Sequence, residues 1–341
     1  MLQTLPSNHF AGLGNVTVGN AKPGQDLASI LNGYLGAMFG PGLVLHVDGR
    51  YGTDNTVEGE DRYPKSAVTW GTSWDKAFKT IQAALVVARG AGTGSNPLLD
   101  SNYDQNHNVT ILVAPGNYAE NLIMVGAGIR LIGLGYPGTD RGVSITPPDM
   151  SGSYPGSMIV QGSGFEIANI LIVNNYAYPT IWFDKMHSSW VHDVILYGDG
   201  TATIGFTTNG MKNSILERNR ISMFATAGIE VNYDASAPDY IIGSVIRDNY
   251  VGKGTGTGIL IDASLVGYDS YVERNRVEGN GLTKCIDNNC VGDIMIVENR
   301  CVIAANDANA IESANPRGGM VQNSLVYNSG AKIVNHFPAD A

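Results

Sequence analysis

"SILERNRISMFATAGIEVN", residues 214–232, is the stretch that decides the fold. It joins a short apolar run, a charged group centred on an asparagine, and a second apolar run that follows a glycine. The charged group returns as "VERNR" at 272–276 and as "VENR" at 297–300. Because a fixed repeat period constrains a fold more strongly than local propensity does, the period of this unit is the first property to establish.

Seven copies of the unit align on one polar position, with spacings of 24, 26, 30, 26, 24 and 24 residues. The aligned residues are Asn169, Asp193, Asn219, Asn249, Asn275, Asn299 and Asn323. A second apolar column follows about ten residues later, as in "GIEVN" at 228–232 and "GILID" at 258–262. Each unit therefore holds two short alternating strands and a turn, and its period is too short for a helical crossover between parallel strands.

This pattern predicts an all-β fold, a single-stranded parallel β-helix in which each coil pairs with its neighbours at about 4.8 Å. Identical side chains then stack in columns, and stacked asparagines form a favourable amide ladder. The residues beside the asparagines alternate in sign between coils, which indicates neutralising stacks on a solvated face; they are Arg218, Asp248, Arg274 and Glu298. The aligned polar residues are accordingly interpreted as a structural turn ladder.

The chain ahead of the repeats divides into an arm and a cap. Residues 1–43 lack the repeat and are expected to form an irregular N-terminal arm for attachment or oligomerisation, while residues 44–341 form the β-helix domain. Within "GTSWDKAFKTIQAALVVAR" (71–89), apolar residues fall on one stripe and Thr72 or Ser73 can cap a helix. We expect an amphipathic helix at about 73–89 to cover the open end of the solenoid, where unpaired strand edges would otherwise meet water.

The segments around this helix carry a family resemblance. Trp-x-x-Ala-Phe-x-Thr-Ile-Gln-x-Ala from Trp74, followed by Ile-Leu-Val-Ala-Pro-Gly-Asn-Tyr-x-Glu from Ile111, is similar to the N-terminal entry of pectate-lyase-like right-handed parallel β-helix proteins. The resemblance covers roughly residues 43–330 and implies a right-handed coil. This superfamily includes polysaccharide lyases, glycoside hydrolases, bacteriophage tailspikes and other virion surface proteins, so the fold alone does not choose a function.

The amino-acid composition limits the kinds of partner that we expect the protein to bind. Charged residues make up 15%, glycines number 43, and the formal net charge is −10 without a Lys/Arg cluster. Nucleic acid and anionic membranes are therefore unfavourable partners. The apolar stretch at 27–47 is interrupted by glycines and Pro41, which argues against a membrane span.

Cysteine usage and the first residues suggest where the protein is made. Cys285 and Cys301 replace inward aliphatic residues, and Cys290 lies in a turn where it could pair with Cys285; buried reduced thiols are the favoured interpretation. No basic and apolar signal peptide opens the chain. We therefore expect synthesis in a bacterial host cytoplasm and a final location in a virion.

Candidate catalytic residues are sparse. A glycoside hydrolase needs two carboxyl groups about 5–9.5 Å apart across a groove. Asp184, Asp234 and Asp262 are the best candidates, but Thr207 and Asn232 occupy the aligned strand positions between them. The order Trp190-Val-His192-Asp193 only partly resembles a pectate-lyase strand, and His187 and His192 have a poor spacing for a shared metal. No metal and no cofactor are expected.

Together these features favour a non-enzymatic bacteriophage virion surface protein, such as a capsid decoration, a head or tail fibre, or a spike subunit. Its N-terminal arm would anchor it to other capsid or tail proteins, and a homotrimer is expected. A surface polysaccharide is a possible ligand because exposed aromatic residues near the turns can stack on sugar rings. The alternative is an enzyme that hydrolyses or lyses polysaccharide, like a tailspike depolymerase.

Overall fold

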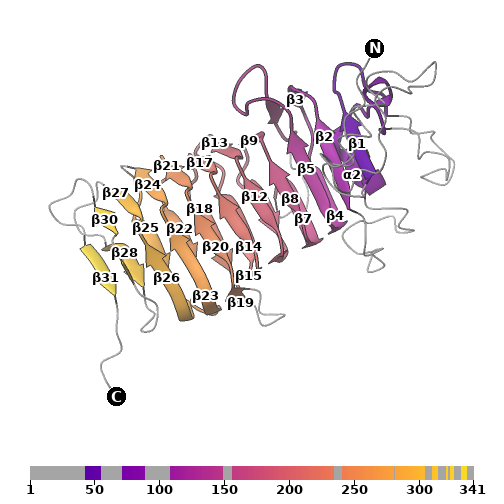
Figure 1. The fold of residues 1–341 in the computed structure, drawn as a ribbon. Helices are drawn as coiled ribbons and strands as arrows, with labels where there is room; N and C mark the ends of the chain where they lie inside the picture. Colours follow the sequence, from indigo (N-terminus) through magenta and orange to yellow (C-terminus); the bar gives the residue numbers. More distant parts are fainter. Residues whose placement is uncertain are drawn as a thin grey trace, which may run out of the picture.

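The computed structural model describes residues 43–54, 71–88, 108–148, 156–233, 240–279, 281–303, 309–313, 320–321, 323–325 and 332–335. Its strands pair only in parallel, in one 22-stranded sheet and one nine-stranded sheet, here called sheet B. They stack as successive coils from β1 at one end to β31 at the other (Figure 1). The predicted parallel β-solenoid is confirmed, and the expected arm at 1–43 lies almost wholly outside the described residues.

Pairing divides the larger sheet into two faces. The β18 face contains β4 (Leu122–Ala127), β7 (Met158–Ser163), β10 (Ile181–Phe183), β14 (Ile204–Asn209), β18 (Ala227–Asn232), β22 (Thr257–Ile261), β25 (Lys284–Asn288), β28 (Asn309–Ser313) and β31 (Lys332–Asn335). The β20 face contains β1 (Leu43–Val47), β2 (Val109–Val113), β5 (Ile129–Gly133), β8 (Glu166–Ala168), β12 (Trp190–His192), β16 (Ile215–Glu217), β20 (Val245–Arg247), β23 (Val266–Glu273), β26 (Val291–Val297) and β29 (Met320–Val321). The short strands β11 (Met186–His187), β15 (Met211–Lys212) and β19 (Tyr240–Ile242) precede β12, β16 and β20.

Sheet B forms the third side of each coil. Its strands are β3 (Gly116–Tyr118), β6 (Val143–Ile145), β9 (Ile170–Asn174), β13 (Ile195–Gly198), β17 (Arg220–Ser222), β21 (Tyr250–Gly252), β24 (Arg276–Gly279), β27 (Arg300–Ile303) and β30 (Ser324–Leu325). A single coil thus runs from β18 through β19 and β20 to β21, and the next coil begins at β22.

The core is a set of stacked apolar columns between these sides. On the β18 face the in-register residues are Ile181, Phe206, Ile229, Ile259, Ile286 and Ile311, all fully buried. Phe183 lies between Phe165 and Phe206, with ring centroids 6.4 and 5.5 Å apart. Each such side chain contributes about 1.5–3 kcal/mol by its burial, so the core follows directly from the repeat.

The cap differs from its prediction. Trp74–Lys76 forms a 3-10 turn, and the α-helix α2 spans only Ile81–Ala88. The reason is that Ala77 is extended and Phe78 bridges to Val47, so the backbone between them joins the sheet and cannot continue a helix. Thr80 then caps α2 through a hydrogen bond from the Ala83 amide, 3.2 Å long.

Helix α2 still covers an open strand edge. It contributes buried Ile81, Ala84, Leu85 and Ala88 to the core. The Gln82 side chain accepts a hydrogen bond from the Ile123 amide at 2.8 Å and donates one to the Ile123 carbonyl at 3.3 Å. This side chain therefore substitutes for a neighbouring strand along β4, which protects that edge from pairing with another chain.

Candidate functional site

A file of asparagines marks the turn between the β20 face and sheet B. Each Nδ2 donates to the Oδ1 of the next asparagine at 3.0 Å along Asn219, Asn249, Asn275, Asn299 and Asn323. The same Oδ1 atoms accept the backbone amides of the preceding asparagines at 2.9–3.0 Å. These buried polar groups are thus saturated within the turn, as a structural ladder requires.

Two residues predicted for this ladder lie one position away from it. Strand pairing aligns Ile195 with Arg220, which places Val194 at the position of Asn219. Asn169 and Asp193 instead share the left-handed backbone of Arg218, with φ of 56°, 54° and 53°. The sequence alignment grouped Asn169 and Asp193 with the ladder asparagines because all of these residues are polar. In the structure they occupy a left-handed backbone position, which Asn and Asp tolerate.

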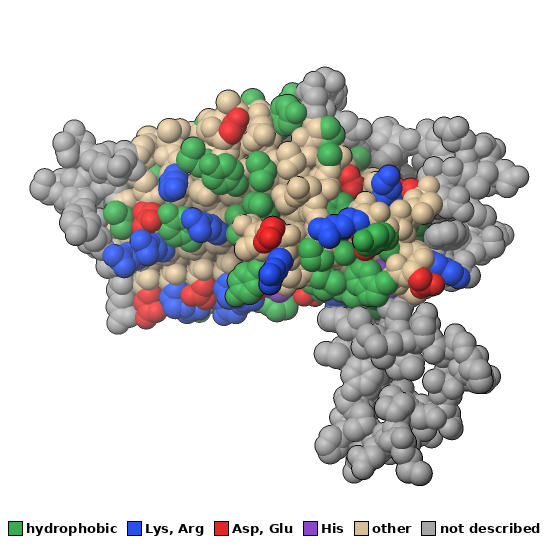
Figure 2. Space-filling view, turned by 90° about the horizontal axis from the view of Figure 1, so that it is seen from above, with side chains coloured by type: hydrophobic (Ala, Val, Ile, Leu, Met, Phe, Trp, Pro, Cys, Tyr) green, Lys and Arg blue, Asp and Glu red, His purple; other side chains and the backbone are tan. Residues whose placement is uncertain are grey.

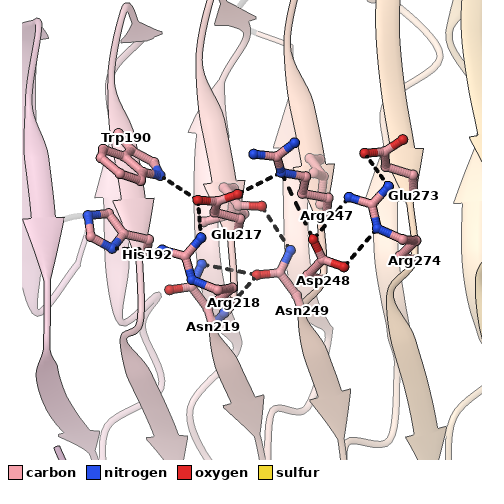
Figure 3. A network of polar contacts seen from close by, with 12 residues as sticks. Trp190, His192, Glu217, Arg218, Asn219, Arg247, Asp248, Asn249, Glu273 and Arg274 are labelled. Carbon is pink, nitrogen blue, oxygen red and sulfur yellow. Dashed lines mark hydrogen bonds and ion pairs between the residues drawn. The ribbon is translucent and has the colours of Figure 1, made fainter. Parts of the chain in front are cut away.

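Glu217 is the most buried charge beside the asparagines, with a side chain only 3% exposed. Figure 3 shows Trp190 and Arg247 converging on its carboxylate: Trp190 Nε1 donates at 3.1 Å and Arg247 Nε at 2.6 Å. Arg218 also pairs with it. Burial opposes ionisation, but the hydrogen bonds from the two arginines hold the pKa of Glu217 below its usual value.

Further ion pairs extend this cluster along the solenoid. Arg218 pairs with Asp193 at 2.9 Å, and Arg274 pairs with Asp248 at 3.0 Å. We call the set Asp193, Glu217, Arg218, Arg247, Asp248, Glu273 and Arg274 the ion-pair ladder. Opposite charges alternate from coil to coil, as the sequence predicted, and Figure 2 shows red and blue side chains alternating along one edge of the molecule.

His192 closes one end of the ladder. Its Nδ1 lies 2.7 Å from Asp193 Oδ2, and its Nε2 lies 3.2 Å from Glu166 Oε1. The imidazole also stacks on Trp190, with centroids 3.8 Å apart. Burial favours the neutral ring, but the bonds to the two carboxylates raise the pKa of His192 above its usual value. Both ring nitrogens contact carboxylates, so we interpret His192 as a structural extension of the ion-pair ladder.

The predicted carboxylates do not meet. Asp184 follows Phe183 and Asp262 follows Ile261, and pairing through Thr208 and Val231 places these positions three coils apart. Three coil spacings of 4.8 Å are about 14 Å, which is beyond the range of a glycosidase pair. Asp234 lies outside the described residues.

Sequence reasoning missed Glu230, which lies on the β18 face one coil from Asp262. Its Oε2 accepts a hydrogen bond from Thr207 Oγ1 at 3.0 Å. Burial raises the pKa of Glu230, the Thr207 hydrogen bond lowers it, and the charge of Asp262 raises it further. The available signal was a glutamate at an outward position of the apolar run "GIEVN".

Thiols and histidines offer little to a metal. Cys285, Cys290 and Cys301 are free and buried, and burial raises the pKa of Cys290 to about 12. Across the described ranges, no group of three or more His, Cys, Asp and Glu residues is placed to hold a metal ion. In those same ranges, no helix has the length and apolar character to cross a membrane.

The geometry defines the class of protein: a parallel β-helix with an amide ladder and an ion-pair ladder at one turn. The model of the family described as "Periplasmic copper-binding protein (NosD)" matches residues 105–331, more than half of the chain. The chain belongs to this family. The predicted membership of the parallel β-helix superfamily is thereby confirmed.

Solved structures with a similar fold are distant. The Dettilon tailspike protein is 9% identical with a TM-score of 0.39, and the match covers 96% of this chain and 73% of that one. The A-modules of the Azotobacter vinelandii mannuronan C-5 epimerases AlgE6 and AlgE4 are 12% and 13% identical, with TM-scores of 0.27 and 0.32. Each of these matches covers 76% of this chain and 95% of the module. No curated protein matches the chain.

Proposed function

We propose that this protein is a non-enzymatic surface subunit of a bacteriophage virion, a capsid decoration, fibre or spike. Residues 1–43 anchor it to other virion proteins, and three copies assemble into the particle-bound form. The product is made in the bacterial cytoplasm and leaves with the particle.

The observation that supports this proposal is that polar side chains link each coil to the next along the solenoid. The asparagine file links consecutive coils through paired hydrogen bonds. The ion-pair ladder joins coils beside it, and its charges are engaged with one another. Such groups stiffen a rod without presenting reactive atoms, which suits a protein that must hold its shape outside a cell.

Particle association tests the proposal. Purified phage particles from the source strain are probed with an antibody against the β-helix, and the bound copies are imaged by electron microscopy. We expect labelling at regular positions on intact particles. A second preparation carries a chain that lacks residues 1–43: it should melt like the full chain but leave particles unlabelled. Absence of the full chain from purified particles would refute the virion proposal.

A polysaccharide-cleaving enzyme is the second candidate, and Glu230 with Asp262 favours it. A raised pKa favours the protonated form of Glu230, which can donate to a glycosidic oxygen, and Asp262 is a second carboxyl group one coil away. Incubation with capsule, lipopolysaccharide and polygalacturonate should then release reducing ends. Glu230→Gln and Asp262→Asn would abolish this release, whereas Asp184→Asn would not. No release by the unmodified protein removes this candidate.

Copper binding, the property in the family's description, does not fit the described residues. Copper sites use His, Cys and Met ligands with open geometry. Here the three thiols lie in the core, and both nitrogens of His192 contact carboxylates. The Nδ1 of buried His46 faces the Gly71 carbonyl at 2.9 Å, its Nε2 has no hydrogen-bond partner, and among the described residues it belongs to no group of three His, Cys, Asp or Glu side chains that could hold a metal. We therefore assign no copper role to these groups.

A further inference from the structure

Sheet B carries a column of side chains that breaks the rule of alternating charge. Strand pairing places Arg220, Tyr250, Arg276 and Arg300 in register on four successive strands, β17, β21, β24 and β27. The three arginines are exposed. Figure 2 looks onto the side of the molecule where Figure 1 labels these strands, and blue side chains lie on it. We call Arg220, Arg276 and Arg300 the arginine row.

The contacts within the row leave it with excess positive charge, because the one carboxylate beside it, Glu278, interacts with both Arg276 and Arg300. Arg276 pairs with Glu278, with its Nη2 2.6 Å and its Nε 2.8 Å from Oε2. Arg220 and Arg276 flank the Tyr250 ring, at 5.5 and 5.8 Å from its centroid. Among the residues that the structure describes, no carboxylate lies within ion-pair distance of Arg220 or Arg300.

Stability does not explain why Arg276 and Arg300 are neighbours. Arg276 and Arg300 face each other directly in parallel strands, and like charges in that position destabilise a sheet. The ion-pair ladder of the same coils places opposite signs in sequence, so the chain has the means to neutralise a column. A row of like charge on a protein with a net charge of −10 instead suits an anionic ligand from outside.

The ligand must be long, and its charges must be spaced. Arg220 and Arg276 are two coils apart, about 10 Å, and Arg300 is one coil further. Guanidinium groups bind carboxylates and phosphates through paired hydrogen bonds. Both faces of Tyr250 are flanked by arginines, which removes the stacking platform that single-stranded nucleic acids use. The negative net charge also disfavours densely charged DNA and lipid surfaces.

We propose that the arginine row on sheet B binds a linear glycan that carries spaced anionic groups, as carboxylates or phosphodiesters. The glycan lies along the solenoid axis, with one anion at Arg220 and the next, about 10 Å further along, between Arg276 and Arg300. Tyr250 holds the first two guanidinium groups in place, and Glu278 fixes Arg276 through its ion pair. The site gives the proposed surface subunit a means of contacting an acidic cell envelope, but its binding is measurable on the isolated protein.

Binding of defined polymers tests the site. The full chain is titrated with hyaluronan fragments, which carry one carboxylate per two sugars, and with poly(glycerol phosphate), which distinguishes the two anion sources. Neutral dextran, dextran sulfate and a thymidine oligonucleotide serve as comparison polymers. We expect at least one of the first two to bind at low salt, and dextran not to bind. Equal or tighter binding of the oligonucleotide or of dextran sulfate would overturn the selectivity for spaced anions.

Variants locate the site and separate binding from folding. Arg220→Gln with Arg300→Gln should weaken glycan binding at least tenfold, while Arg141→Gln, an exposed arginine outside the row, should change it less than twofold. The double variant should still melt cooperatively close to the parent temperature, because it relieves the repulsion between Arg276 and Arg300 but removes the contact of Arg220 with Tyr250. Unchanged binding, or loss of the cooperative melting transition, would show that the row is structural. The particle-labelling experiment is independent of either result.

Discussion

At the scale of single residues, Glu217 is the charge that most depends on its partners. Its carboxylate is buried between Arg247 and Arg218 and accepts the Trp190 indole N–H. Glu217→Gln keeps the shape but removes the charge from these bonds, and hydrogen bonds to a charged group contribute about 1.5–3 kcal/mol. We expect urea unfolding to show a loss of this size.

Glu273→Gln provides the matched control for this prediction. Glu273 pairs with Arg274 at 2.9 Å, but its side chain is 19% exposed, compared with 3% for Glu217. Solvent-exposed pairs contribute about 1 kcal/mol or less. Equal losses in the two variants would mean that burial does not set the strength of the ladder.

His192 makes stability depend on pH. Its folded-state pKa is raised above the ordinary value of about 6.5. Burial of the ring and Arg218, which faces it at 3.3 Å, oppose the charged form, but the hydrogen bonds to Glu166 and Asp193 favour it more strongly. A raised pKa gives stabilisation that is complete below the unfolded pKa and disappears as pH rises through the folded pKa. Melting temperature should therefore fall between about pH 6.5 and the folded pKa, and His192→Asn should remove that part of the fall. His187→Asn should retain it; a profile unchanged by His192→Asn would contradict the assignment.

At the scale of the element, the asparagine turn unites several coils. Asn275 is 1% exposed, donates to Asn299 Oδ1 and to the Ile246 carbonyl, and accepts from both the amide and the side chain of Asn249. Asn275→Ala leaves these buried groups without partners, at a cost of about 3 kcal/mol. Chemical unfolding should show this loss. Asn232→Ala, at a half-buried asparagine outside the file, should cost about 1 kcal/mol or less.

The asparagine turn also shows which parts of the structure the sequence pattern could predict and which it could not. The repeat predicted the file from Asn219 to Asn323 because identical residues recur at nearly one period. It misplaced Asn169 and Asp193, because one residue of register separates a ladder position from a left-handed position and both accept Asn. Helix α2 was predicted too long for a related reason: Phe78 fits an amphipathic stripe, and only the bridge to Val47 shows that it belongs to the sheet.

At the scale of the whole molecule, the fold was predictable because each coil restates the same constraint. The candidate sites were not predicted, because the repeat pattern does not show which outward side chains contact one another. Glu230 and Asp262 are 32 positions apart, and Arg220 and Arg276 are separated by a full intervening coil. Both registers depend on the 30-residue coil between Asn219 and Asn249, which a constant period would have misplaced.

The modular construction leads to a last prediction, on removal of one entire coil. Asn249 and Asn275 are 26 residues apart, so deletion of residues 250–275 joins Asn249 to Arg276 and preserves the apolar columns and the asparagine file. In a solenoid, stability is roughly a sum of coil and interface contributions, and the shortened chain should fold and melt cooperatively. A deletion of half that length, residues 250–262, shifts the register and exposes core columns, so it should aggregate or lose its cooperative transition. Circular dichroism and size-exclusion chromatography distinguish the two outcomes. If both deletions fold equally well, the columns do not determine the register; if neither folds, the coils are not interchangeable units.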